Sequence, residues 1–264
     1  MLTSQQASPQ LTFHDYVELW QLSKRRIRSE ADYRAFQAFQ ATLLLRYLYQ
    51  HQVDIRGKLV LDVGSGIGGY SEEMARRGAR IISLDLMAYA VRLSGDCMAV
   101  AGSALALPLQ SASVDFVFCA SLIEHVPQPA KLLAEVKRVL KPGGHCYLSF
   151  PPFYSPVGGH EYAPFHYLGE RWAMRLATRR SQRSHPAWAQ QLYKVAENPN
   201  SFAGTYEDWG LFVMTIAKAR QLIKVSGFEL LNVATRYLPM SFVRWPLLGE
   251  LLTWHAQFLI KKPG

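Results

Sequence analysis

The chain has 264 residues, of which 49% are hydrophobic and 19% charged, so it can bury a core as one large domain with an insertion. This composition excludes a disordered protein, and no apolar run reaches the length of about 18 residues that a membrane-spanning helix needs. The net charge is +9, with basic residues grouped at 24–28 and 171–183. We expect a diffuse basic surface, with anionic lipid head groups or an acidic substrate as alternative partners. No nucleic-acid-binding motif accompanies the charge, so nucleic acid is not an expected partner.

Nothing in the sequence indicates export. Residues 1–9 lack the basic-then-apolar layout of a secretory signal. Cys97, Cys119 and Cys146 are odd in number, lack C-x-x-C spacing and lie in apolar runs. We therefore expect reduced thiols in a cytoplasmic protein.

The pattern of secondary structure changes twice along the chain. Residues 13–50 have helical periodicity, and strands are predicted at 59–63, 80–84, 97–101, 114–119 and 145–150, with a clear helix at 131–140. This alternation predicts a parallel sheet with right-handed crossovers. About sixty residues rich in Arg, Trp, Tyr and His then follow, before a helix near 214–225 and strands at 228–236 and 254–261.

The predicted parts are an N-terminal helical segment (1–54), a core (55–152 and 214–264) and an insertion (153–213). In doubly wound sheets, ligands bind at the carboxyl ends of the strands. An insertion after the fifth strand would therefore lie over the bound ligand as a lid and select the molecule that reacts with it; the alternative is a rigid structural or dimerising appendage.

The most informative stretch is a glycine turn. The apolar run 59–63 ends in Gly64-Ser-Gly-Ile-Gly-Gly69 and continues into a helical pattern, which brings backbone N–H groups and a helix N-terminus close to a nucleotide. A second apolar run ends at Asp85, where a carboxylate can accept hydrogen bonds from both ribose hydroxyls of an adenine nucleoside. The sequence therefore predicts an adenosine-containing ligand.

Five motifs in register resemble the class I S-adenosylmethionine-dependent methyltransferases, most closely the small-molecule branch typified by ubiquinone and menaquinone C-methyltransferases. The motifs are Leu61-Asp-Val-Gly-Ser-Gly-Ile-Gly68, Leu84-Asp85, Gly102-Ser-Ala-Leu-Ala-Leu-Pro108, the stretch from Val114 to Val126, and Leu140-Lys-Pro-Gly-Gly144. The resemblance is dense over 55–152 and loose over 214–262. It implies an α/β fold, a Rossmann-like, doubly wound, mostly parallel seven-stranded sheet with helices on both faces, and S-adenosyl-L-methionine as cofactor.

The resemblance also implies a role for each cofactor residue. The glycines would admit the methionine portion, Asp62 would lie near its cationic amine and sulfonium, and Asp85 would bind the ribose. Ser103 stands where the family usually has Asp, beside the adenine. The full predicted set is Asp62, Gly64, Ser65, Gly66, Gly68, Asp85, Leu86, Ser103, Ala104, Cys119 and Ala120. The structural alternatives are that Asp62 only fixes the glycine turn and that Asp85 only caps the next helix.

Methyl transfer from a sulfonium is an in-line displacement, so the protein chiefly positions the reactants and excludes water. Candidate bases are Glu124, His125, His160 and His166, and of these the three histidines are the candidate catalytic residues, as a base or to orient the acceptor. His160, Glu161 and His166 lack the helical i, i+4 spacing of a metal site, so no metal is expected. The aromatic insertion predicts an apolar pocket for a small-molecule or lipid-like acceptor, whose identity the sequence leaves open, as it does the oligomeric state.

Two other functions share the glycine pattern. A nicotinamide-dependent oxidoreductase or epimerase of the short-chain type needs Tyr-x-x-x-Lys, and no Tyr in this chain has Lys four residues later. A non-catalytic binding module could keep the fold, but it would have no need of the intact turn with Asp62 and Asp85.

Overall fold

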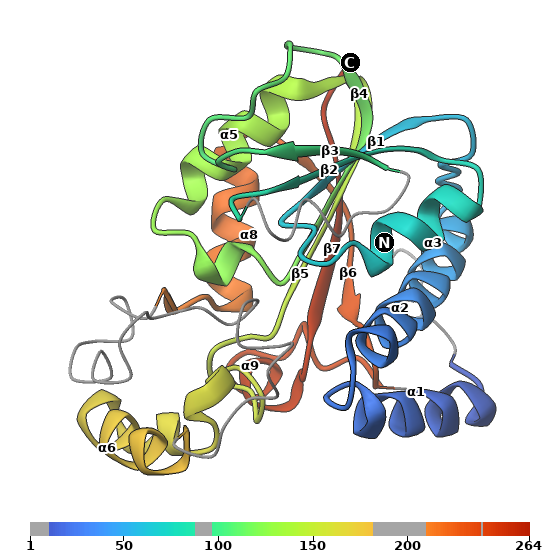
Figure 1. The fold of residues 1–264 in the computed structure, drawn as a ribbon. Helices are drawn as coiled ribbons and strands as arrows, with labels where there is room; N and C mark the ends of the chain where they lie inside the picture. Colours follow the sequence, from blue (N-terminus) through green and yellow to red (C-terminus); the bar gives the residue numbers. More distant parts are fainter. Residues whose placement is uncertain (1–10, 88–96, 182–209, 239) are drawn as a thin grey trace.

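The computed structural model describes residues 11–87, 97–181, 210–238 and 240–264. Within them, seven strands form one sheet in the order β3-β2-β1-β4-β5-β7-β6 (Figure 1). Strand β7 is antiparallel to β5 and β6, and the other neighbouring strands are parallel. This confirms the predicted fold class. The strands are β1 (Leu59–Val63), β2 (Arg80–Asp85), β3 (Met98–Ala101), β4 (Val114–Ala120), β5 (Leu140–Phe150), β6 (Glu229–Thr235) and β7 (Ala256–Lys261).

Strand β5 differs most from the sequence prediction. It begins at Leu140 rather than near residue 145, directly after helix α5 (Pro129–Val139). The pairing of β4 with β5 shifts register between Val114 and Phe116, so the Pro-Gly-Gly run is accommodated as an irregularity in the sheet. Gly143 has φ +74° there, a conformation that favours glycine.

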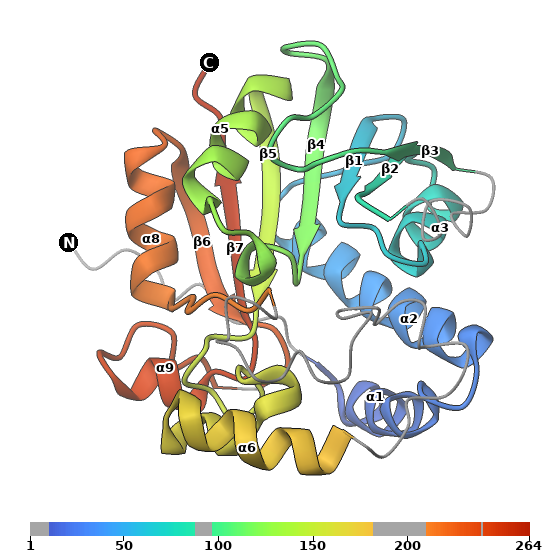
Figure 2. The same ribbon diagram turned by 60° about the vertical axis from the view of Figure 1, so that its left-hand side comes forward.

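Helices cover both faces of the sheet (Figures 1 and 2). Helices α2 (Glu30–Gln50) and α3 (Gly69–Arg76) lie on one face, and α5 and α8 (Ile216–Val225) lie on the other. Each face of the sheet carries an apolar cluster, the first under α2 and α3 and the second under α5 and α8. Side chains of β4 alternate between them: Phe116 and Phe118 join the first, and Val117 and Cys119 the second. Because α2 packs into the first cluster, the N-terminal helical segment shares the core of the sheet.

The insertion lies beyond the carboxyl ends of β4 and β5 (Figure 2). Its described elements are the short 3₁₀ turns His160–Tyr162 and Phe165–Leu168 and helix α6 (Glu170–Ser181), close to which lies α9 (Leu248–Leu252). Phe153, Tyr162 and Met174 belong to a small apolar cluster of its own. Residues 182–209 of the predicted lid lie outside the described residues.

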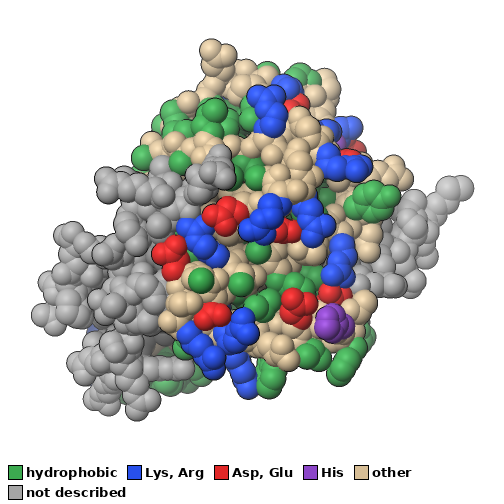
Figure 3. All heavy atoms as spheres, turned by 45° about the vertical axis from the view of Figure 1, so that its right-hand side comes forward, with side chains coloured by type: hydrophobic (Ala, Val, Ile, Leu, Met, Phe, Trp, Pro, Cys, Tyr) green, Lys and Arg blue, Asp and Glu red, His purple; other side chains and the backbone are tan. Residues whose placement is uncertain are grey.

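The face over the N-terminal helices and α3 carries basic and acidic side chains side by side (Figure 3). Arg34 contacts Glu72, and Arg76 and Arg77 both contact Glu73. Interspersed charges cancel beyond the Debye length of about 8–10 Å, so this face offers no single-sign field to a partner.

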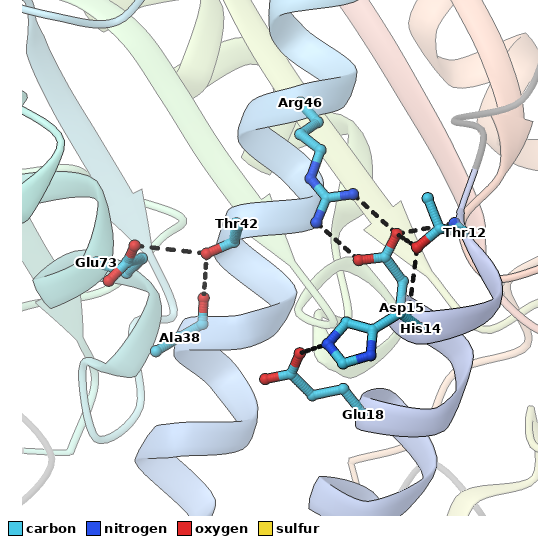
Figure 4. Close-up of polar contacts among 8 residues, drawn as sticks. All are labelled: Thr12, His14, Asp15, Glu18, Ala38, Thr42, Arg46 and Glu73. Atoms are coloured by element: carbon cyan, nitrogen blue, oxygen red, sulfur yellow. Dashed lines mark hydrogen bonds and ion pairs between the residues drawn. The ribbon is translucent and has the colours of Figure 1, made fainter.

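Helix α1 (Phe13–Arg25) is tied to α2 by a buried carboxylate (Figure 4). The N-terminal helical segment thus consists of two helices, α1 and α2. The Arg46 guanidinium donates to both Asp15 oxygens, at 2.8 and 2.7 Å, and the Thr12 N–H donates to Oδ2 at 2.8 Å. Asp15 is 3% exposed, and its bonds to Arg46 hold its pKa well below the ordinary range.

Replacing Asp15 with Asn should lower the free energy of unfolding by about 1.5–3 kcal/mol at pH 7, the scale of hydrogen bonds to charged groups. Because the folded-state pKa is depressed, this stabilisation is complete above the unfolded pKa of about 3.9 and is lost as the pH falls below it. Urea unfolding of wild type and Asp15→Asn at pH 7 and pH 3 should show the difference shrink. The exposed Asp54→Asn variant should change little, and an equal effect from it would contradict this role of Asp15.

Candidate cofactor and catalytic site

The glycine turn after β1 is held against the end of β2. The N–H groups of Gly64 and Ser65 both donate to the Leu84 carbonyl, at 2.8 and 3.1 Å. Gly64, Gly66 and Gly68 have φ of +75°, +54° and +82°. A Cβ at Gly64 would lie 3.0 Å from Leu122, whereas one at Gly66 would have no atom within 4 Å. The turn thus packs tightly on one side and is open at Gly66, where a ligand can approach the backbone.

Asp85 links the two strand ends. Its Oδ2 accepts the Gly66 N–H at 2.9 Å, and its Oδ1 accepts the Met87 N–H at 2.9 Å. A carboxylate has about four acceptor positions, so two are used here and two are left for ribose hydroxyls. Asp85 can therefore order the glycine turn and bind a nucleoside at once. The alternative role of Asp85, as the cap of a helix that follows it, falls on residues outside the described part of the chain.

Asp62 lies beneath the first turn of α3 and is 2% exposed. The Ser71 hydroxyl donates to its Oδ2 at 2.6 Å, and the Ser83 hydroxyl donates to Ser71 at 2.7 Å. Burial raises the pKa of Asp62 to about 7, against the opposing effect of the Ser71 hydrogen bond. No basic side chain of the described residues forms an ion pair with it. A cationic ligand would therefore stabilise its ionised form.

Ser71 and Ser83 were missed at the sequence level. The available signal was weak: Ser83 is a hydroxyl inside an apolar strand, and Ser71 is a polar residue on the buried side of a short helix.

The predicted adenine side is formed by the loops after β2 and β3. The Gly102 N–H donates to the Asp85 carbonyl at 2.9 Å, which places Ser103 and Ala104 next to the end of β2. Ser103 Oγ accepts the Leu105 N–H at 3.2 Å. Leu86 is 75% exposed and offers an apolar surface beside Asp85. An adenine ring could therefore contact Leu86 and the backbone of this loop.

The end of β4 places Cys119 and Ala120 beside β1. Cys119 is buried, and burial raises the pKa of its thiol well above the ordinary value, so it is a packing residue and not a nucleophile. Ala120 is half-buried, and Ser121 after it has φ +52°. The β4 strand end therefore leaves backbone, and no reactive side chain, facing the turn.

Two of the three predicted histidines come together and the third does not join them. The rings of His125 and His160 meet edge to face at 4.8 Å between centroids. His125 Nδ1 donates to the Gly210 carbonyl at 2.8 Å, which leaves Nε2 with its lone pair. His166 instead lies in the insertion, where its Nε2 donates to the Ser155 carbonyl at 3.1 Å and its ring packs against Phe153.

Glu124 completes the cluster around His160. Its side chain is 2% exposed, and neither carboxyl oxygen has a hydrogen-bond partner among the described residues. His160 Nε2 lies 3.7 Å from Glu124 Oε1. Burial raises the pKa of Glu124 to about 8, and burial next to His125 lowers the pKa of His160 to about 3.

Close packing determines the backbone before His160. A Cβ at Gly158 would lie 1.8 Å from the Pro152 carbonyl oxygen, and a Cβ at Gly159 would lie 2.4 Å from the His166 ring. Glycine at both positions lets the loop after β5 fold back on itself, which brings His160 towards Glu124.

An apolar groove of about 1020 Å³ opens at the same edge of the sheet, beside the N-terminus of α8. It contains none of the predicted cofactor residues. Its apolar walls come mainly from the link between β6 and β7, and the charged residues Arg220, Arg244 and Glu250 also line it. The lining includes Tyr154, Ile216, Val243, Trp245, Leu247 and Leu251.

Comparison with known proteins places this geometry in a family. The family described as Methyltransferase domain matches residues 61–148, which span β1 to β5. A Mycobacterium ulcerans protein described as an uncharacterized methyltransferase is 34% identical over 172 residues, 62% of this chain and 68% of that protein. The chain belongs to the class I S-adenosylmethionine-dependent methyltransferases.

Other similarities agree with this methyltransferase fold. A Mycobacterium leprae protein, also an uncharacterized methyltransferase, is 34% identical over 157 residues, and the chain spans 58% of its length, less than two thirds. Solved S-adenosylmethionine-dependent methyltransferases share the fold at low identity. That of Mesorhizobium loti has a TM-score of 0.54 at 17% identity, covering 83% of this chain and 97% of that one. That of Archaeoglobus fulgidus has a TM-score of 0.53 at 14% identity, covering 84% and 94%.

The residues present fit S-adenosylmethionine, the cofactor of this family. The open backbone at Gly66 suits the close approach of the cofactor, the free acceptor positions of Asp85 suit its ribose, and the unneutralised Asp62 suits its positive charge. When bound, the cofactor supplies an activated methyl group. The protein supplies position and charge.

Replacing Asp85 with Ala should weaken S-adenosylhomocysteine binding by about 1.5–3 kcal/mol, because the change removes the Gly66 anchor and the oxygens expected to bind the ribose. Titration calorimetry measures this directly. Glu229→Ala, at the opposite end of the sheet, should leave the affinity unchanged. An unchanged affinity for Asp85→Ala would mean that Asp85 does not contact the cofactor.

Proposed function

We propose that this methyltransferase transfers the methyl group of S-adenosylmethionine to a small-molecule acceptor with a large apolar part, such as a lipid-like molecule. The apolar groove carries the proposal. It opens at the carboxyl edge of the sheet, where the cofactor residues also lie, and its apolar lining matches an acyl or isoprenoid chain better than a polar amine. Arg220 and Arg244 would attract a negatively charged group on the acceptor, since the Glu250 carboxylate in the same groove already accepts the Ile216 and Ala217 N–H groups.

His125 and His160 are proposed as the residues nearest the acceptor, and His166 as a residue that orders the insertion. The loop after β4 carries His125, and the loop after β5 carries His160, so both meet at the edge where the methyl group would be presented. The insertion 153–213 is proposed to cover this edge and keep water from the reaction.

Release of S-adenosylhomocysteine tests the proposal. Purified protein should turn over acceptors that carry an acyl or isoprenoid chain in a panel that also holds short phenols, sugars and amines. Leu251→Lys, in the groove wall, should raise the KM of the apolar acceptor at least about ten-fold, or ~1.4 kcal/mol, and leave S-adenosylhomocysteine affinity unchanged. Leu230→Lys, at the far end of β6, is the matched control. Turnover only with hydrophilic acceptors would contradict the proposal.

A contact with an anionic membrane surface is proposed from the surface next to this groove. Trp245, Leu247 and Trp254 are 53%, 82% and 48% exposed around α9. Trp172, at the start of α6, is 58% exposed and lies under the Arg175 guanidinium. Apolar side chains next to arginine are suited to the interface of an anionic bilayer. No helix among the described residues is long and apolar enough to cross a membrane.

Vesicles with anionic lipid should therefore co-sediment with the protein at low salt and release part of it at high salt. Trp245→Ser with Leu247→Ser should weaken binding several-fold, whereas Trp20→Ser, an equally exposed tryptophan on α1, should not. Failure to sediment at low salt would remove the membrane contact and leave the apolar acceptor standing.

A cytoplasmic, reducing location is part of the proposal. It is supported by the cysteines of the described residues, none of which forms a disulfide.

A further inference from the structure

Glu124, His125 and His160 form a compact group at the carboxyl edge of β4. One ligand atom from each residue lies within 4.8 Å of those of the other two. Tetrahedral ligands bound about 2.0–2.2 Å from Zn²⁺ are roughly 3.3 Å apart, so modest side-chain rotations would close the group around an ion. The set comes from two loops, which is why spacing along the chain gave no sign of it and led to the expectation of no metal.

Buried polar atoms of Glu124 and His160 lack hydrogen-bond partners among the described residues. A carboxyl group that is 2% exposed has neither oxygen hydrogen-bonded among the described residues, and the buried Nε2 of His160, which has no hydrogen-bond partner there either, points towards it. Buried polar groups are otherwise satisfied in more than nine cases in ten. A bound cation would give the carboxyl oxygens and the His160 Nε2 a partner at the same time.

His125 has the outer hydrogen bond that metal-binding histidines use. Its Nδ1–H donates to the Gly210 carbonyl at 2.8 Å, which fixes the ring and leaves the Nε2 lone pair available. Two imidazoles and one carboxylate are a ligand set that Zn²⁺ and similar divalent ions bind, with one position left open.

We infer that Glu124, His125 and His160 bind one divalent transition-metal ion, whose open position takes an oxygen of the methyl acceptor. The ion site stands on the geometry alone, and the role towards the acceptor rests on the proposed function. A bound ion lowers the pKa of a hydroxyl group. The hydroxyl proton then leaves to solvent, the oxygen bonds to the methyl carbon, and the carbon–sulfur bond breaks to release S-adenosylhomocysteine.

Co²⁺ binding to untagged, chelator-treated protein tests the site. Visible absorption should saturate at one ion per chain. Glu124→Gln and His160→Asn should each weaken Co²⁺ at least ten- to 100-fold, since outer partners of a ligand already cost that much. As a control, His14→Ala removes the exposed histidine that pairs with Glu18, and it should leave the Co²⁺ affinity unchanged. No saturable binding, or binding that survives both ligand changes, overturns the site.

Two further measurements keep the result decisive. S-adenosylhomocysteine binding, measured on the same samples, shows that the variants are folded, and it separates failure of the metal site from failure of the methyltransferase. In the wild-type Co²⁺ protein, proton spectra should contain two strongly shifted, exchangeable imidazole N–H signals, one for each histidine. Their absence would overturn the assignment even if both variants were unstable.

Discussion

The hydrogen bond from the Gly66 N–H to the Asp85 carboxylate joins the carboxyl ends of β1 and β2, and the cofactor edge is arranged around it. The bond holds the glycine turn against β2, while the Leu84 carbonyl holds the preceding two residues. Glycine is required because the turn needs positive φ at three positions and because Leu122 packs against Gly64. Helix α3 then begins at Gly69 and brings Ser71 over Asp62.

The same edge holds ionisable groups whose burial is not matched by opposite charge. Among the described residues, Asp62 accepts from the Ser71 hydroxyl but forms no ion pair, and the carboxyl oxygens of Glu124 have no hydrogen-bond partner. Arg236, directly after β6, is 4% exposed and donates to the Tyr70 hydroxyl at 2.8 Å. Unmatched burial of polar groups costs free energy, and such groups gather where a ligand is bound. The buried carboxyl groups of Asp62 and Glu124 agree with a site that is completed by a cationic cofactor and, as we infer, a metal ion, whereas the Arg236 cation is held by the Tyr70 hydroxyl.

The sheet could be predicted from the sequence because its signals are local. Runs such as Leu59 to Val63 and the glycine turn specify their own structure. The prediction of β5 was wrong only at its start, because pairing with β4 extends the strand through Pro-Gly-Gly. The helical periodicity of residues 13–50 is equally local, whereas the contact between Asp15 and Arg46 forms only after the chain has folded back.

The candidate site was less predictable, since its contacts join distant segments. The role of Asp85 could be predicted from the number of residues that separate it from Gly64, but its hydrogen bond with the Gly66 N–H could not. Glu124 and His160 are 36 positions apart and meet only because the loop after β5 turns back towards β4. His166, equally suggestive in sequence, points instead to Ser155 within the insertion.

The most direct test of the account concerns the positive charge of the cofactor and the buried Asp62. Because burial raises the pKa of Asp62 to about 7 and a sulfonium favours its ionised form, affinity for S-adenosylmethionine should rise about ten-fold from pH 6 to pH 8. Calorimetry on wild type and Asp62→Asn, which keeps an acceptor for Ser71, measures this. The account predicts that the variant loses this pH dependence, while the contribution of the ligand's own amine stays the same. An equal pH profile for the two proteins would contradict it.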